Sequence, residues 1–441
     1  MDVLSSLMTF FFFLTLFLSS PLTSQTLTPN CAAAVSGSTS TLRVFHVDSP
    51  CSPFRTKQTP SWEETVLKSQ SNDHERLQYL VSLVAGKSFV PIASGRQQPV
   101  QSPTYVVKAS VGTPPQSFLL AVDTSNDAAW IPCGGCVGCS STVFTSELST
   151  SYKTLGCQDS HCQQVTNPIC SVTGSCSFNI TYGGSTVAAN LSQDTVNLAG
   201  DNITGYTFGC IQKVTGTSVP PQGLLGLGRG PLSLLSQSQN LYQSTFSYCL
   251  PSYKSLNFSG TLRLGLIAQP KTIKYTPLLK NPRRSSLYYV DLLAIKVGRN
   301  TVAIPPSSLS FNTTTGAGTI IDSGTVFTRL VQPAYEAVRD EFRRRMGTAT
   351  VISLGGFDTC YTVPVTIPSI TFLFAGLNVT LPQDNFLIHS SSGSTTCLAM
   401  AASPANVNSV LNVVASFQQQ NHRYLFDIPN NRLGISREAC S

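Results

Sequence analysis

Two aspartates, Asp123 and Asp322, each end a short apolar run and precede small or hydroxyl-bearing residues. The runs read LLAVDTS over 119–125 and TIIDSGT over 319–325. Two carboxylates brought close together cannot both ionise easily, so they share a proton and titrate as a pair. Such a pair can hold a water molecule, which the ionised carboxylate deprotonates while the neutral one donates to a carbonyl oxygen. The two residues therefore predict amide hydrolysis without a covalent intermediate, a metal or a cofactor.

The two aspartates lie 199 residues apart, too far for one turn or helix. A motif repeated at about half the chain length predicts two related lobes, each supplying one carboxylate. The residues that follow offer hydroxyl, amide and backbone N–H donors to the carboxylates; they are Thr124, Ser125, Asn126, Ser323, Gly324 and Thr325. The alternative, that each aspartate only caps a turn, does not explain the apolar strand before each one.

The segment ITYGGS over 180–185 predicts a hairpin with Tyr182 near its tip. Such a hairpin is suited to closing over an extended substrate and excluding water. Trp130 follows Asp123 by seven residues, and we expect its indole N–H to hold the tyrosine hydroxyl.

The elements that must position these residues are mainly strands. From Tyr105 onward, short β-branched and aromatic runs alternate with Gly, Pro, Asn and Ser, which predicts an all-β body. The clearest helix in it is expected over 333–346, where a proline opens it and Gly347 closes it. Three arginines at its end, 343–345, favour a solvated helix terminus over a DNA-binding face.

The N-terminal hundred residues have a different character. The apolar run 7–18 is too short to span a bilayer and predicts a signal peptide over 1–24, with an uncleaved membrane anchor as the alternative. Residues 25–100 form a leader with a predicted amphipathic helix over 61–87, which begins with a capping box of Ser61 and Glu64. The polar stretch RQQPVQSP after Gly95 predicts a processing boundary near 96–103.

Composition limits the remaining function classes. Charged residues make up 11% of the 441 residues, and 28 Lys and Arg against 21 Asp and Glu give a net charge of +7. That excess is too small to predict nucleic-acid binding. Fourteen cysteines favour an oxidising compartment. Six sequons could accept glycans there: Asn179, Asn190, Asn202, Asn257, Asn312 and Asn378.

Seven cysteines fall between 133 and 176, and they begin with Cys133, Cys136 and Cys139 at three-residue spacing. With His161 nearby they could be read as zinc ligands, but secretion favours disulfides. Because seven is odd, at least one partner must lie outside this region, and Cys210 is the expected one.

The chain resembles the pepsin-type aspartic proteases, and in detail their plant nepenthesin-like branch, from about Tyr105 to Arg437. The motifs that carry the resemblance are GTPPQ over 112–116, the two aspartate motifs, Tyr182 in the flap position, GLLGLGRG over 223–230 with PLSLLSQ after it, FQQQN over 417–421, and the segment 427–434. The sequence departs from the family at Ser125 and Asn126, where Gly and Ser are usual, and at Ala415 and Ser416, where Gly and Asn are usual.

The resemblance implies a bilobal double β-barrel with a cleft between the lobes, a propeptide that blocks the cleft, and endoproteolysis of extended peptides. The chain is most similar to the apoplastic, defence-associated plant members, so we expect a monomer secreted to the apoplast or cell wall. After the first 24 residues no stretch approaches about 20 uninterrupted apolar residues, so we expect no stable insertion into a membrane. We expect an N-terminal lobe over 101–280, with a cysteine-rich insertion over 133–176, and a C-terminal lobe over 281–441. A second reading is a catalytically silent binder or inhibitor on the same fold, like the xylanase-inhibitor relatives.

In the cysteine-rich insertion the branch has disulfides, and we expect Cys360 to pair with Cys397 and Cys249 with Cys440. Twelve mature cysteines then form six bridges: Cys133, Cys136, Cys139, Cys157, Cys162, Cys170, Cys176, Cys210, Cys249, Cys360, Cys397 and Cys440.

Overall fold

The computed structural model describes residues 40–52, 54, 61–85, 105–216, 218–252, 260–266, 269–270, 272–390, 392–404 and 409–440. The expected signal peptide, the processing boundary near 96–103 and the sequon at Asn257 lie outside these residues. Within them, no helix has the length and apolar character needed to cross a membrane.

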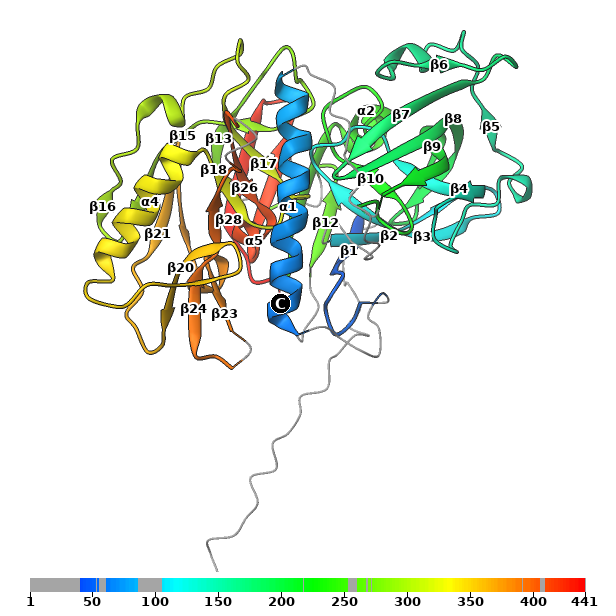
Figure 1. Cartoon of the computed structure of the whole chain (residues 1–441). Coiled ribbons are helices and arrows are strands. Elements are labelled where there is room, and N and C mark those ends of the chain that lie inside the picture. Colours follow the sequence, from blue (N-terminus) through cyan, green and yellow to red (C-terminus); the bar gives the residue numbers. More distant parts are fainter. Residues whose placement is uncertain are drawn as a thin grey trace, which may run out of the picture.

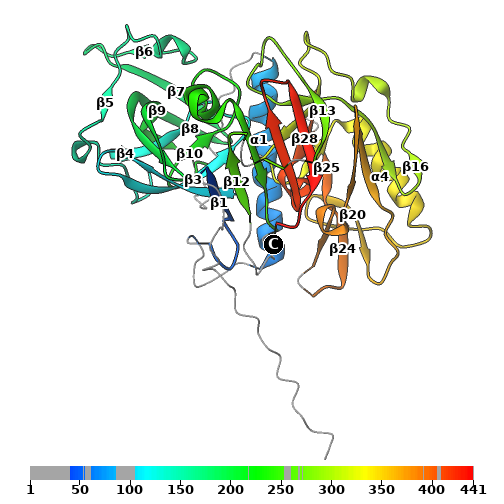
Figure 2. The same ribbon diagram turned by 180° about the vertical axis from the view of Figure 1, so that it is seen from behind.

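Two β-rich lobes lie on either side of a long helix, α1 (Trp62–Ala85) (Figures 1 and 2). The leader also contributes β1 (Thr41–His46). The strands of the N-terminal half are β2 (Tyr105–Val111), β3 (Gln116–Asp123), β4 (Trp130–Val137), β5 (Lys153–Thr154), β6 (Ile169–Cys170), β7 (Cys176–Tyr182), β8 (Ser185–Leu198), β9 (Asp201–Thr215), β10 (Leu224–Gly226), β11 (Thr245–Cys249) and β12 (Thr261–Leu264), with short helices α2 (Leu234–Gln237) and α3 (Gln239–Tyr242). The all-β, two-lobed fold predicted from the sequence is confirmed.

The C-terminal half also consists mainly of short strands. Its strands are β13 (Lys274–Leu279), β14 (Tyr289–Val290), β15 (Leu292–Val297), β16 (Asn300–Thr301), β17 (Gly318–Asp322), β18 (Thr328–Leu330), β19 (Ile352–Leu354), β20 (Phe357–Thr362), β21 (Ile370–Phe374), β22 (Leu377–Leu381), β23 (Leu387–His389), β24 (Thr395–Leu398), β25 (Met400–Ala402), β26 (Leu411–Ala415), β27 (His422–Asp427) and β28 (Arg432–Arg437). Its helices are α4 (Gln332–Arg345), one residue from the expected bounds at each end, and α5 (Ser416–Gln419).

A six-stranded antiparallel platform joins the lobes in the order β1, β12, β11, β27, β28, β13. The central pairing, β11 with β27, connects strands from the two halves of the chain. Phe246 and Phe426 stack there with ring centroids 4.5 Å apart. Strand β1 was not anticipated from the sequence, which predicted only a helix in the leader.

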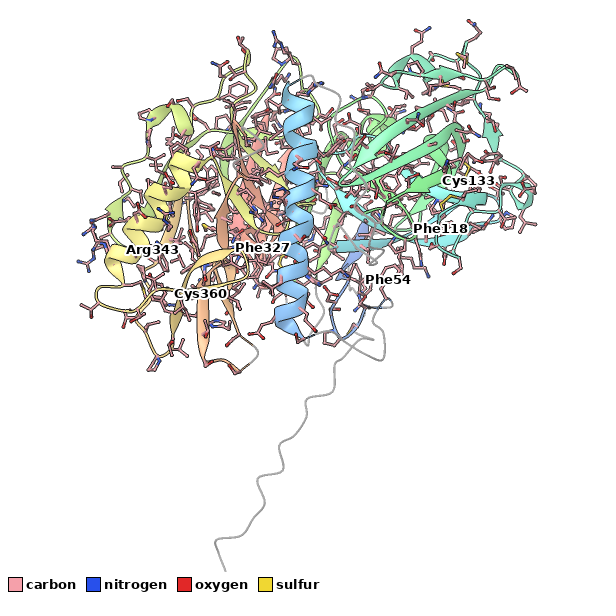
Figure 3. All side chains as sticks on the ribbon, viewed as in Figure 1. Phe54, Phe118, Cys133, Phe327, Arg343 and Cys360 are labelled. Atoms are coloured by element: carbon pink, nitrogen blue, oxygen red, sulfur yellow. A yellow bond between two sulfur atoms is a disulfide. The ribbon has the colours of Figure 1, made fainter. Side chains whose placement is uncertain are left out.

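Twelve of the described cysteines pair with one another, within each lobe and across the platform. The pairs are Cys133–Cys210, Cys136–Cys139, Cys157–Cys170, Cys162–Cys176, Cys249–Cys440 and Cys360–Cys397. Figure 3 places Cys133 in one lobe and Cys360 in the other. Two of these bridges fasten the irregular segment 157–176, which has few long strands of its own.

The arginines at the end of α4 make local ion pairs. Arg344 and Arg345 both contact Glu341, at 2.6 and 2.9 Å. Arg343 lies 3.5 Å from Asp358. These contacts fit a solvated helix terminus, where positive charges interact favourably with the negative, C-terminal end of the helix dipole.

Candidate active site

Asp123 and Asp322 occupy equivalent positions in the two lobes and are both fully buried. Asp123 ends β3, which runs parallel to β10 and places the aspartate opposite Gly226. Asp322 ends β17, which runs parallel to β26 and places it opposite Ala415. The aspartate motif repeated in the sequence therefore corresponds to a repeated pair of parallel strands, and each pair presents one carboxylate.

Reciprocal hydrogen bonds join the two aspartate loops. The Ser323 hydroxyl accepts from the Thr124 backbone N–H at 3.2 Å, and the Thr124 hydroxyl accepts from the Ser323 N–H at 3.0 Å. The two hydroxyls also donate across the interface, Thr124 to the Ile321 carbonyl and Ser323 to the Val122 carbonyl. Because each loop donates to and accepts from the other, the relative position of the carboxylates is fixed from both lobes.

Each carboxylate has donors from its own loop. Asp123 accepts from the Ser125 N–H at 2.9 Å, from the Ser125 hydroxyl at 3.0 Å and from the Asn126 side-chain amide at 2.8 Å. Asp322 accepts from the Gly324 N–H at 3.3 Å and the Thr325 hydroxyl at 2.5 Å. All six residues expected to support the pair therefore lie around it.

Ser125 and Asn126 fit their positions in this loop. Ser125 is not among the described residues with a positive φ, so the backbone there does not need glycine. Gly226, in contrast, cannot be replaced without movement, because a Cβ would lie 2.1 Å from the Asp127 carbonyl oxygen. The glycine-rich segment at 223–230 thus lets β10 and the following turn approach the loop that follows Asp123 closely.

Arg76 of α1 inserts its guanidinium between the two aspartates. It donates to Asp123 at 2.8 and 2.9 Å and to Asp322 at 2.9 and 3.0 Å. It also contacts the Ser125 hydroxyl at 2.7 Å. The arginine side chain is only 2% exposed. The position between the carboxylates that a water molecule would need is therefore filled by a cation.

The charges at this site depend on one another. Burial alone would raise the pKa of Asp123, but the charge and hydrogen bonds of Arg76, together with those of Ser125, leave that pKa lowered. Burial alone would lower the pKa of Arg76, but Asp123 and Asp322 raise it well above its usual value. Arg76 and Asp123 accordingly hold each other in their charged forms.

The expected hydrogen bond from Trp130 to Tyr182 is wrong for this state of the protein. The Tyr182 hydroxyl instead donates to Asp123 at 3.0 Å and accepts from Arg76 at 3.2 Å. Trp130 packs edge-on against the tyrosine ring at 5.4 Å, and its buried indole N–H has no hydrogen-bond partner among the described residues. Arg76 and the carboxylate together form a stronger polar site for the hydroxyl than an indole N–H does.

Other residues of α1 fasten it to the C-terminal lobe. Asp73 accepts from the backbone N–H groups of Val326 and Phe327 at 2.8 and 2.7 Å. Gln70 accepts from the Gly356 N–H, and its backbone carbonyl accepts from Arg329. Burial raises the pKa of Asp73 to about 6, although Arg329 and the two N–H groups oppose that rise.

Apolar contacts hold both ends of α1. Toward its C-terminal end, Leu77, Leu80, Val81 and Val84 pack against a cluster that includes Ile320 of β17. Toward its N-terminal end, Val66 packs with Phe327 and Phe417. The predicted capping box also forms, because Ser61 and Glu64 exchange hydrogen bonds at 2.7 and 3.2 Å.

Sequence reasoning missed Arg76 and Asp73. The signal was present, because polar residues at 70, 73 and 76 continue the buried face that Val66 begins and Leu77 and Leu80 complete. Charged side chains are almost never fully buried unless paired. Polar residues on the apolar face of a leader helix therefore point to partners elsewhere in the chain.

Comparisons with known proteins agree with this geometry. The family models described as Xylanase inhibitor N-terminal and Xylanase inhibitor C-terminal match residues 105–266 and 287–437. The crystal structure of edgp has a TM-score of 0.64 at 21% identity, covering 80% of this chain and 96% of that one. The crystal structure of conglutin gamma from lupine seeds has a TM-score of 0.62 at 19% identity, covering 76% and 92%. These structures support the fold.

Curated relatives are more similar in sequence. Aspartyl protease AED3 of Arabidopsis thaliana is 50% identical over 99% of this chain and 100% of its own length. Aspartyl protease 25 of Oryza sativa is 44% identical over 91% and 94%. Aspartic proteinase nepenthesin-1 of Nepenthes gracilis is 34% identical over 76% and 78%. The chain therefore belongs to the pepsin-like aspartic proteases of plants, in the nepenthesin-like branch.

Proposed function

We propose that this protein is made as a latent, secreted aspartic endopeptidase, in which Asp123 and Asp322 activate one water molecule once α1 leaves the cleft. The observation that carries the proposal is the pair of buried carboxylates, one from each lobe, bridged by Arg76 at hydrogen-bond distance. A guanidinium occupies a position where a water molecule could contact both aspartates.

Departure of Arg76 changes the protonation of the pair. Without the cation, two close carboxylates repel each other, and the pair binds one shared proton. The ionised member then takes a proton from the water, and the protonated member donates to the carbonyl oxygen of the peptide. The amine leaves with a proton returned by the pair, so no covalent enzyme intermediate is needed.

The surrounding residues have distinct roles in this proposal. Thr124 and Ser323 hold the two carboxylates in a fixed relative position, because their hydrogen bonds join the two loops. Ser125 and Asn126 supply donors to Asp123 although they differ from the family's usual residues. Tyr182, in the hairpin between β7 and β8, closes over the bound peptide and excludes water.

We further propose a signal peptide over 1–24, an inhibitory propeptide over 25–100, and lobes over 101–280 and 281–441. The protein is secreted as a monomer to the apoplast or cell wall. Six disulfides support an oxidising compartment. Of the five sequons in the described residues, Asn179, Asn202, Asn312 and Asn378 are exposed and Asn190 is half-buried. N-terminal sequencing of the secreted protein should give a start near residue 25 before acidification and within 96–103 after it.

The decisive experiment measures cleavage of an unfolded protein between about pH 3 and pH 6. The full chain is expressed for secretion, acidified, and assayed with and without pepstatin, which mimics the tetrahedral intermediate. We expect pepstatin-sensitive cleavage that Asp322→Ala abolishes. If folded, propeptide-free protein cleaves nothing and does not bind pepstatin, the pair is silent, and the protein is a binder or inhibitor on a protease fold.

A further inference from the structure

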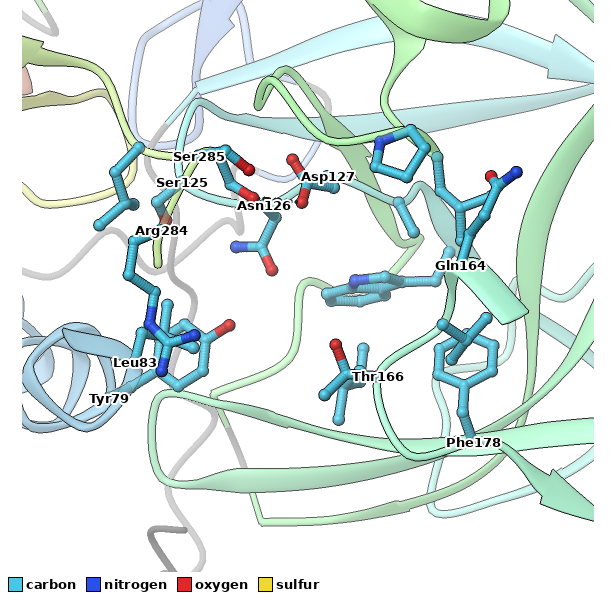
Figure 4. A pocket seen from close by; sticks show the side chains of 18 of the residues that line it. Tyr79, Leu83, Ser125, Asn126, Asp127, Gln164, Thr166, Phe178, Arg284 and Ser285 are labelled. Atoms are coloured by element: carbon cyan, nitrogen blue, oxygen red, sulfur yellow. Dashed lines mark hydrogen bonds between the residues drawn. The ribbon is translucent and has the colours of Figure 1, made fainter. Parts of the chain in front are cut away.

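A cavity of about 240 Å³ lies beside the catalytic loop. The mature lobes supply most of its wall, including Asn126, Trp130, Leu232, Arg284 and Leu287, and the side chains of Tyr79 and Leu83 from α1 complete it (Figure 4). We call it the Arg284 cavity. Ser125, which donates to Asp123, also lines it, so the cavity begins one side chain away from a catalytic carboxylate.

The wall formed by α1 is removed when the helix leaves the cleft. Figure 4 shows Arg284 extending beside Tyr79 and Leu83 at that side of the cavity. Withdrawal of the helix therefore opens the Arg284 cavity to a peptide that replaces α1 next to the catalytic pair. The walls that remain belong to both lobes, as expected for a subsite of an enzyme that binds its substrate between them.

Two polar groups that line the Arg284 cavity are donors left without a hydrogen-bond partner among the described residues. Within the described part of the chain, the buried Nε of Arg284 has no hydrogen-bond partner, and the same is true of the Trp130 indole nitrogen. Arg284 is also without an ion-pair partner among the described residues, and its guanidinium donates to the Arg283 carbonyl at 3.1 Å. Buried donors left unpaired are costly, so they favour a ligand with acceptor oxygens.

The charges of the lining point to the same ligand. Arg283 and Arg284 are cationic, and Asp127 is the acidic residue of the lining. The Asp127 carboxylate is already engaged, because it accepts from the Ser286 hydroxyl at 2.5 Å and from the Gly230 N–H at 2.7 Å. A guanidinium with an unused N–H binds a carboxylate by a charge-assisted hydrogen bond.

We infer that the Arg284 cavity is a substrate subsite that selects an acidic side chain, with Arg284 as its specificity-determining residue; this rests on the proposed peptidase activity. Phe178, Ile180 and Leu232 contact the methylene groups of the substrate residue, and Arg284 binds its carboxylate. Glutamate suits both requirements, whereas glutamine has the same shape without the charge.

The test uses acid-activated full chain and peptide pairs that differ only by Glu or Gln, placed in turn at each position flanking the cleaved bond. At one position, we expect kcat/KM for Glu to exceed that for Gln about tenfold near pH 6. The ratio should fall toward one near pH 3, because the glutamate, with a pKa of about 4.3, is then neutral. Arg284→Gln should bring the ratio near pH 6 close to one at that position.

Two further variants separate charge from packing. Arg284→Lys keeps the charge and should retain part of the preference, whereas Arg299→Gln, at an exposed residue outside the cavity, should leave it unchanged. If every form cleaves the Gln peptides and no position shows an Arg284-dependent preference, the inference is overturned and the peptidase proposal stands. If no form cleaves any peptide, both fail.

Discussion

Arg76 makes buried ion pairs with two carboxylates at once, so its removal should have a larger effect than the loss of a surface ion pair. Removing one partner of a buried pair typically costs about 3–5 kcal/mol. We expect Arg76→Gln to weaken the binding of α1 and to raise the initial rate of peptide cleavage by the full chain, near pH 5.5, at least tenfold. The measurement is a fluorogenic peptide assay begun at acidification.

Lys68→Gln is the matched control for this prediction, because Lys68 lies on the exposed face of the same helix. It should leave the latency of the chain unchanged. If Arg76→Gln and Lys68→Gln are equally slow to activate, the latency comes from the apolar contacts of α1 and not from the guanidinium.

Asn126 should set the acid side of the pH profile. Its amide donates to Asp123 at 2.8 Å, which favours the ionised carboxylate. Hydrogen bonds to charged groups contribute about 1.5–3 kcal/mol, so Asn126→Ala should raise the lower apparent pKa of kcat/KM by about one to two units. Asn126→Ser, the usual residue of the family, should restore most of the profile. An unchanged profile in the alanine variant would show that the amide does not act on the pair.

The leader elements, β1 and α1, should respond to acid through His46. This residue is the last of β1, is buried, and packs edge-on against Tyr105 with ring centroids 5.2 Å apart. Burial lowers the pKa of His46 to about 3, from about 6.5 when exposed. A lowered pKa means that docking of β1 is fully stabilised above about pH 6.5 and weakens as the pH falls, by up to about 1.4 kcal/mol per unit.

Asp123 acts in the same direction, because its pKa is lowered while Arg76 is docked and its stabilising effect is lost as the pH falls. Asp73 opposes the effects of His46 and Asp123 on docking. Because the pKa of Asp73 is raised to about 6 in the docked leader, its carboxylate binds a proton there as the pH falls, and this favours the docked state. When the leader is released at acidic pH, His46 becomes exposed and binds a proton, which favours release. Phenylalanine cannot bind a proton, so His46→Phe should slow activation near pH 5 about tenfold. Rates of leader release, followed by gel electrophoresis over a pH series, test this.

His161→Phe serves as the control, because His161 lies in the cysteine-rich segment, away from the leader strand. It should activate as the unmodified chain does. A His46→Phe variant with an unchanged pH dependence would leave Asp123 and its partner as the source of acid activation.

The features that could be predicted from the sequence are those whose residues lie close together along the chain. The repeated aspartate motifs, the capping box at Ser61 and the helix near 333–346 all carry their own signals, and each is present in the structure. Strand β1 does alternate, with Leu42, Val44 and His46 facing inward, but a histidine at an inward position weakens the hydrophobic pattern. Arg76, and the hydrogen bond of the Tyr182 hydroxyl to Asp123, were missed for another reason: the partners lie in distant parts of the chain.

At the scale of the whole molecule, the bridge between Cys249 and Cys440 joins residues 191 apart. Cys249 ends β11, which pairs with β27 across the interlobe platform, and Cys440 follows β28 near the C-terminus. In the chain-entropy account a loop of this size stabilises the folded state by about 5 kcal/mol, compared with about 2 kcal/mol for the short loop of Cys136 and Cys139.

We therefore expect the double variant Cys249→Ser, Cys440→Ser to lower the Tm by about 10 °C, at about 2–4 °C per kcal/mol. Cys136→Ser, Cys139→Ser should lower it by less than half as much. Differential scanning calorimetry of the full chain at neutral pH, where α1 stays docked, measures both. A larger loss from the short loop than from the long one would mean that local geometry in the cysteine-rich segment, and not closure of the platform, governs the stability of the molecule.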